Sequence, residues 1–196
     1  MKSRWITLAL CLLVVVVLIV RVLPRGGRHS QGHSSSGRQA ASPNAYLGLR
    51  SLVLEGSRAN FGLGPASSPT QPFAVVADWG SPQGSTTIVA IADGSASVYL
   101  SSGAGFIGGG QSHESIRDAA IKTVELAATV QPLMRPTTQF PLANPQQVTF
   151  YAVTDAGVFT ASASEGDLAD NRSPFSQLAA AAQKILTEYR NLPPAR

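Results

Sequence analysis

The stretch TTIVAIADGSASVYLS, residues 86–101, decides the fold class of this 196-residue chain. The pair Asp93-Gly94 separates two strand-like runs that are rich in β-branched and small apolar residues. An Asp-Gly pair between such runs is a strong hairpin signal, because both residues accept the positive φ angles of a tight turn. The stretch therefore predicts two antiparallel strands joined at Asp93-Gly94.

Strands are expected on both sides of this hairpin. Residues 73–78 are a short apolar run before it, so three successive strands should form an antiparallel meander. Residues 148–153 and 158–161 are two further strand-like runs, separated by a turn that contains Gly157, and they predict a second hairpin. The sheet should therefore contain about five strands.

Helical patterns follow each group of strands. In residues 112–131 the apolar side chains recur at helical spacing, and Pro132 ends the pattern. A second helix is expected after Ser173, which caps it, with Pro174 at its first position. A looser apolar pattern in residues 46–57 suggests one more short helix. The sequence thus predicts an α+β fold, with the antiparallel sheet flanked by two or three helices.

Residues 1–23 predict an N-terminal membrane anchor. Residues 5–23 are apolar apart from Thr7 and Arg21, and about 20 mostly apolar residues suffice for a helix to cross a bilayer. A cleaved signal peptide is the alternative, but no small-residue cleavage site follows the run. Residues 24–44 are rich in Gly, Ser and Arg and predict a flexible linker, which leaves residues 45–196 as a single globular domain.

Charge is divided unevenly along the chain. The first 44 residues hold six basic residues and no acidic one, so the remainder, with nine basic and eleven acidic residues, carries a net charge of −2. Sequence-independent binding to nucleic acid requires clustered Lys and Arg, so we expect no nucleic-acid partner.

We place the chain at the cell membrane as a single-pass protein. Basic residues flank the anchor on both sides, with more after it, which leans towards a cytoplasmic domain and leaves the orientation open.

Gly103, Gly105 and Gly108 match the Gly-x-Gly-x-x-Gly spacing of dinucleotide-binding loops. Such loops join a strand to a helix within a unit of parallel strands. Here the preceding strand returns from an antiparallel hairpin, and Glu114 and Asp118 would repel phosphate at the start of the following helix. We predict that the glycines serve the backbone, through positive φ angles and close approach to a neighbour, and we keep a ligand-binding loop as the alternative.

Three further residues are candidates for contact or chemistry. His113, the only histidine after residue 44, would need Asp78 or another acid beside it in a hydrolytic site, and no nucleophile motif accompanies it. Trp79 fits either the core or an exposed binding hot spot. The acidic residues in the polar loop 164–172 lack the spacing of a calcium-binding loop. We therefore expect no cofactor and no metal.

The order of elements resembles that of a known group of folds. Three strands, a helix, two strands and a helix across residues 46–192 resemble the profilin-like and roadblock/longin-like domains, in which helices flank an antiparallel sheet. The segment ADGSASVYLSSGAGFIGGG, residues 92–110, is similar to segments of uncharacterised bacterial proteins. The resemblance implies a non-enzymatic scaffold that dimerises or binds a small GTPase or a complex subunit.

Two functions from different classes follow. We favour a membrane-tethered, non-enzymatic interaction or scaffold domain, held to the membrane by residues 5–23 and bound to a protein partner or a second copy. The alternative is a small-ligand-binding or hydrolytic domain that uses residues 103–110 with His113. An enzyme needs His113 to face Asp78 or another acid across a pocket, whereas a module needs an exposed apolar patch or an open sheet edge.

Overall fold

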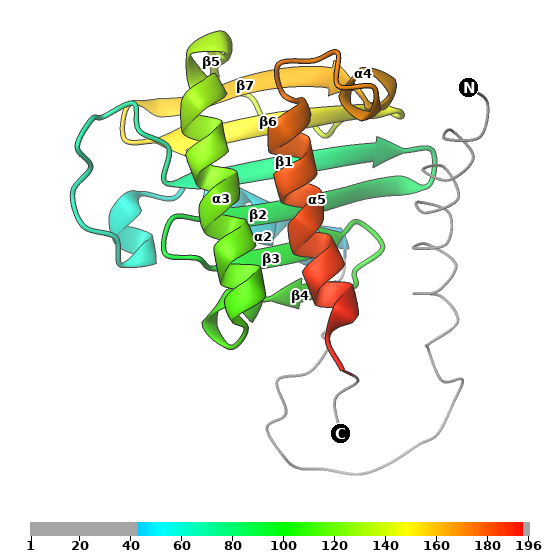
Figure 1. Ribbon diagram of the computed structural model, residues 1–196, viewed down its shortest axis with the longest axis horizontal. Helices are drawn as coiled ribbons and strands as arrows, with labels where there is room; N and C mark the ends of the chain where they lie inside the picture. Colours follow the sequence, from blue (N-terminus) through cyan, green and yellow to red (C-terminus); the bar gives the residue numbers. More distant parts are fainter. Residues whose placement is uncertain (1–42, 194–196) are drawn as a thin grey trace. The chain divides into compact units, whose positions relative to one another are not determined.

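A computed structural model describes residues 43–193 of the protein. Its centre is one seven-stranded sheet, in which every neighbouring pair of strands is antiparallel. The strands follow the order β4-β3-β2-β1-β6-β7-β5 across the sheet (Figure 1). They are β1 (Ala74–Ser81), β2 (Gly84–Ile91), β3 (Ala96–Leu100), β4 (Gly105–Ile107), β5 (Arg135–Thr137), β6 (Gln147–Thr154) and β7 (Gly157–Ser164).

Helices cover both faces of the sheet (Figure 1). The two long helices α3 and α5 lie side by side on one face, and α2 packs on the other. The α-helices of the described residues are α2 (Pro43–Leu54), α3 (Glu114–Val130), α4 (Glu165–Ala169) and α5 (Ser176–Asn191). The short 3-10 helices are η1 (Arg58–Phe61), η2 (Gly109–Gln111) and η3 (Gln131–Leu133).

Each face of the sheet has its own core, because successive side chains of a strand point in opposite directions. The central strand β1 contributes to both. Val75, Ala77 and Trp79 pack against α3 and α5. Ala74 and Val76 join the cluster under α2.

The α+β class, the antiparallel sheet and the Asp93-Gly94 hairpin are confirmed. Gly94 adopts a φ of 86°, which a glycine accepts without strain. The Asp93 carboxylate accepts hydrogen bonds from the backbone N–H and the hydroxyl of Ser95, at 2.7 and 2.9 Å. These contacts are local in sequence, which is why the turn could be identified without the fold.

Several details of the expected fold are corrected. The sheet has seven strands rather than about five, because the three-residue strands β4 and β5 extend its two edges. The polar loop expected at 164–172 contains α4, whose first turn is capped by the Ser164 hydroxyl, 3.1 Å from the N–H of Asp167. Helix α5 begins at Ser176 rather than Pro174, because Ser173 instead closes a turn, its carbonyl accepting from the N–H of Ser176.

The predicted anchor, residues 1–23, and residues 24–42 of the predicted linker lie outside the described residues. The last two residues of that linker, 43 and 44, instead begin α2. Within residues 43–193, no helix combines the length and the apolar character needed to cross a membrane.

Candidate functional site

Asp78 and Trp79, neighbouring candidates on β1, lie on opposite faces of the sheet. Trp79 faces α3 and α5, is 6% exposed, and meets the ring of Phe150 edge-on at 6.4 Å between centroids. It is therefore a core residue and not an exposed hot spot. Asp78 faces α2 and is fully buried, which raises the question of what compensates its charge.

The Asp78 carboxylate is the centre of a buried hydrogen-bond network between α2 and the sheet. Arg50 of α2 donates to its Oδ2 from Nε at 2.9 Å and from Nη2 at 2.6 Å. Thr87, which pairs with Asp78 across β1 and β2, donates its hydroxyl to Oδ1 at 2.5 Å. The Tyr46 hydroxyl lies 2.8 Å from the Thr87 hydroxyl and extends the network back to α2. Both carboxylate oxygens therefore have partners.

The guanidinium of Arg50 is held on its other side by the segment that precedes β6. Its Nη1 donates to the carbonyl of Phe140 at 2.8 Å, and its Nη2 lies 3.3 Å from the carbonyl of Pro141. The Tyr151 hydroxyl also donates to the Pro141 carbonyl, at 2.6 Å. The Arg50 guanidinium carbon lies 5.1 Å from the centroid of the Tyr151 ring, within the range of a cation–π contact.

The electrostatics of this pair are those of a buried ion pair. Burial raises the pKa of the Asp78 carboxyl, and the Arg50 guanidinium and the Thr87 hydroxyl act against that shift. Burial lowers the pKa of Arg50, but the hydrogen bonds and charge of Asp78 outweigh it, so the net direction is upward. We treat the pair as ionised, because protonating Asp78 would leave a buried guanidinium without its counter-charge. Asp78 is 0% and Arg50 4% exposed, so the pair fastens α2 to the sheet and offers solvent no reactive group.

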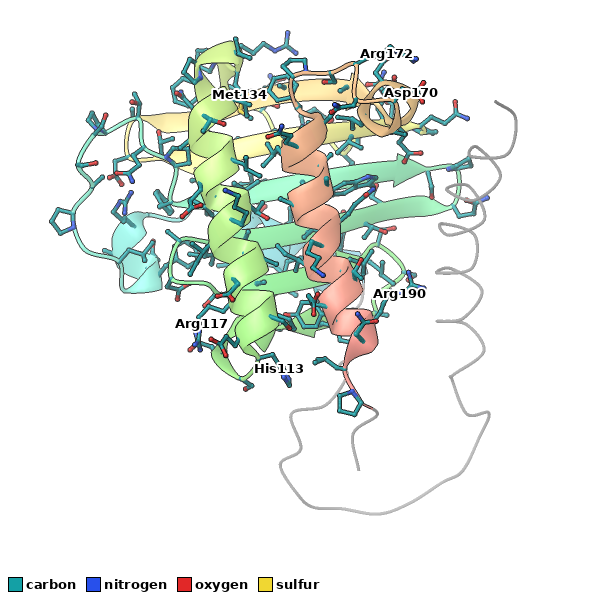
Figure 2. All side chains as sticks on the ribbon, viewed as in Figure 1. His113, Arg117, Met134, Asp170, Arg172 and Arg190 are labelled. Atoms are coloured by element: carbon teal, nitrogen blue, oxygen red, sulfur yellow. The ribbon has the colours of Figure 1, made fainter. Side chains whose placement is uncertain are left out.

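His113 lies at the start of α3, on the face of the sheet opposite to Asp78. Figure 2 shows His113 and Arg117 together at that end of the helix. The backbone N–H of His113 donates to the Gly109 carbonyl at 3.0 Å, and its carbonyl accepts from the N–H of Arg117 at 3.1 Å. The sheet therefore separates His113 from Asp78, and the fold does not assemble the His–Asp pair that a hydrolytic site would use.

The three glycines of the dinucleotide-like motif occupy a turn, a strand and a strand end. Gly103 has a φ of 93° in the turn between β3 and β4, and Gly108 has a φ of 72° after β4. Gly105 lies within β4, where a Cβ would approach the carbonyl oxygen of Val98 to 2.6 Å. The expected backbone role is thus met by positive φ at two positions and by close approach at the third.

Gly109, the residue that follows this motif, packs against the C-terminal helix. The hydroxyl of Tyr189 on α5 accepts from the N–H of Gly109 at 2.8 Å and donates to the carbonyl of Ala96 at 2.6 Å. The Tyr189 ring stacks on Phe106 of β4, with 5.1 Å between centroids. In a dinucleotide-binding loop such an N–H would face phosphate, whereas here Gly109 is engaged inside the protein.

Two surface depressions of the described residues lie away from these candidates. One, of about 320 Å³, lies between α3 and the segment around Pro72, and another, of about 290 Å³, lies between the end of α2 and the turn joining β6 to β7. None of the six candidate residues lines either depression. In residues 43–193, no group of three or more His, Cys, Asp and Glu side chains is placed to hold a metal ion. Just after α4, Arg172 forms ion pairs with Asp167 at 2.8 Å and with Asp170 at 2.5 Å; Figure 2 labels Arg172 and Asp170.

Within residues 43–193, strand β4 is an edge strand of the sheet with no further strand beside it, and the sequence pattern did not predict it. The N–H of Leu100 on β3 donates to the carbonyl of Ala104 at 2.8 Å. Antiparallel residues alternate between pairs that exchange both hydrogen bonds and pairs that exchange none, so Gly105 and Ile107 turn their N–H and C=O groups away from β3. The Ile107 side chain is 61% exposed. The adjacent apolar residues Phe106 and Ile107, flanked by glycines, were the available signal, but two residues are too few to identify a strand.

The opposite edge of the sheet is built differently. Strand β5 consists of Arg135, Pro136 and Thr137, and the first two are exposed. A charged residue and a proline are two of the devices by which proteins prevent further strands from pairing with an edge. The β5 edge is therefore protected, whereas the β4 edge carries neither device.

Comparisons of the chain with protein-family models, with curated proteins and with solved structures find no match. Among the described residues, the β4 edge is the feature with the clearest physical consequence, because its outward backbone groups can bind a further strand.

Proposed function

We propose that this chain is a membrane-tethered, non-enzymatic interaction module whose protein partner adds a β-strand at the open edge of β4. The observation that carries the proposal is the outward direction of the N–H and C=O groups of Gly105 and Ile107. These groups are the donors and acceptors that a further strand requires, and strand addition at a sheet edge is a common mode of protein recognition.

The composition of the edge supports the same proposal. Residues 101–112 contain no charged side chain, although charged residues and proline are the usual protection of an exposed edge. Ile107 adds an exposed apolar side chain next to the free backbone groups. Leu133 lies beside the protected strand β5 at the other edge, and its side chain is 63% exposed, close to the value for Ile107. It therefore serves as a control position for Ile107 in experiments on the β4 edge.

The membrane part of the proposal rests on the sequence. Residues 5–23 have the length and apolar character of a spanning helix, and residues 24–42, which precede α2, have the composition of a flexible linker. A flexible linker of that length has a root-mean-square reach of about 25 Å. The domain would therefore stay close to the bilayer and meet partners within the membrane plane.

Photo-crosslinking of the full chain tests the proposal. A photoreactive phenylalanine derivative is placed at position 107 in one variant and at position 133 in another, and cells producing each are irradiated. We expect the chain to remain with membranes after an alkaline carbonate wash and to form a defined covalent adduct from position 107 only. The nearly equal exposure of Ile107 and Leu133 controls for accidental collision.

Two results would contradict the proposal. Release of the chain by carbonate would refute the tether. The absence of an adduct at position 107, or equal labelling from both positions, would refute the β4 edge as the contact surface.

A further inference from the structure

We infer that the partner at the β4 edge is a second copy of this chain, paired antiparallel to β4 about a two-fold axis at Phe106. This inference rests on the proposed function and names its partner. It follows from the register of β4, from the side chains beside it and from the absence of charge there.

The register of β4 is self-complementary. Gly105 and Ile107 carry the outward backbone groups, and Phe106 between them bonds inward to β3. When two such strands run antiparallel about Phe106, Gly105 of one copy faces Ile107 of the other. Both of these pairs are then hydrogen-bonded pairs, so that each outward N–H meets an outward C=O. No shift of the strand is needed, and the contact is isologous.

The side chains on this edge are complementary in the same register. Ile107 lies on the α2 face of the sheet, since it pairs with Ser97, which in turn pairs with Val89 of the α2-side core. In the paired arrangement the exposed Ile107 side chain lies over the partner's Gly105, which has none. Beside that glycine is Tyr99, its neighbour across β3 and β4. Aliphatic and aromatic side chains across neighbouring strands stabilise each other, so Ile107 would gain cover in the pair.

The charge distribution at the β4 edge allows a second copy of the chain to bind there. The segment 101–112 is free of charged side chains, so a second copy brings no like charges against the edge. The β5 edge, with Arg135, would bring two like charges together in a corresponding symmetric pairing. The two edges therefore predict one symmetric dimer through β4 and no continuing filament, because a two-fold contact closes on itself.

The contact is small, which sets the expected strength. Three residues of edge strand place the interface at the low end of the size range, below about 1,200 Å², where complexes are weak and transient. Confinement of both copies to one membrane would raise their effective concentration and favour the pair.

Cysteine crosslinking of the full chain tests the second copy. In a Cys11→Ala background, Ile107→Cys is compared with Leu133→Cys, both purified in detergent and treated with a short bis-maleimide. The two positions 107 of the proposed pair are diagonal neighbours, about 7–8 Å apart. We expect roughly tenfold more covalent dimer from Ile107→Cys, because docking raises the effective concentration of the two thiols. Gly105 is left unchanged, since a Cβ there would strain the fold itself.

A second variant removes the contact without removing the strand. Ile107→Lys places like charges at those diagonal positions, so sedimentation of the Cys11→Ala chain should show a concentration-dependent dimer that Ile107→Lys lacks. Equal crosslinking at positions 107 and 133, or an unchanged dimer in Ile107→Lys, would overturn the inference. If the photo-crosslinking in cells links position 107 only to a different protein, the inference of a second copy is refuted and the proposal of an interaction module stands. If it crosslinks to nothing, both are refuted.

Discussion

The two faces of the sheet attach their helices by different physics. On the face covered by α3 and α5, most buried side chains are apolar, and the polar contacts of Tyr189 lie at the end near β4. On the face covered by α2, the middle of the interface holds a complete ion pair, Arg50 with Asp78. The free energy gained by burying apolar surface depends little on the relative orientation of the packed elements. A buried ion pair, in contrast, is favourable only when its two groups meet in one geometry.

This difference explains how one 12-residue helix is held in a single position. A short amphipathic helix on a broad sheet can bury apolar side chains in several orientations, but only one of them brings Arg50 to Asp78. Burial of apolar surface is the main contribution that holds α3 and α5 on their face of the sheet. On the other face, the polar network fixes the orientation of α2.

The largest expected effect comes from removing half of the ion pair. Asp78→Ala should lower the free energy of unfolding by about 3–5 kcal/mol, because Arg50 remains buried without its counter-charge. Urea unfolding, followed by Trp79 fluorescence in a Trp5→Phe background, measures it. The double change Arg50→Met with Asp78→Leu should recover most of the loss. A double variant as unstable as Asp78→Ala would contradict the view that the unpaired charge dominates.

A smaller loss of stability is expected from disturbing the contact between Gly109 and Tyr189, on the face covered by α3 and α5. A Cβ at Gly109 would lie 2.5 Å from the Tyr189 hydroxyl oxygen, so Gly109→Ala should displace the ring and cost about 1–3 kcal/mol. Gly108 has open space around its Cβ position and only the strain of a φ of 72°, so Gly108→Ala should cost about 1 kcal/mol. The same unfolding measurement compares the two. A larger loss of unfolding free energy for Gly108→Ala than for Gly109→Ala would contradict this expectation, because it would show that the Tyr189 ring moves aside without an energetic cost.

The smallest effect appears only at alkaline pH. Burial raises the pKa of the Tyr189 phenol from 10.0 to about 12, although the hydrogen bond from the Gly109 N–H acts in the opposite direction. A raised folded-state pKa means that the contribution of Tyr189 is complete below pH 10 and is lost as the pH rises towards 12. Tyr189→Phe removes this term, so the original chain should lose more stability across that interval than the variant. Parallel pH dependences of the two would contradict the raised pKa.

Sequence reasoning succeeded where the deciding contacts are local. The Asp93-Gly94 turn and helix α3 depend on residues within a few positions of each other, and both were predicted. Helix α4 was missed, although Ser164 and Asp167 stand at the spacing of a helix cap, so its signal was present. The strands β4 and β5 are three residues long and exist because β3 and β7 offer partners, which no pattern of three residues reveals.

The sequence by itself determined the α+β class and the hairpins, because these follow from turn chemistry and hydrophobic periodicity. Only the tertiary structure decided the roles of distant residues. Arg50 and Asp78 are 28 positions apart, and Gly109 and Tyr189 are 80 apart. Hydrogen bonds and ion pairs act over a few ångströms, so the partner of a buried polar group, and the edge that stays open, are fixed only when the whole chain has folded.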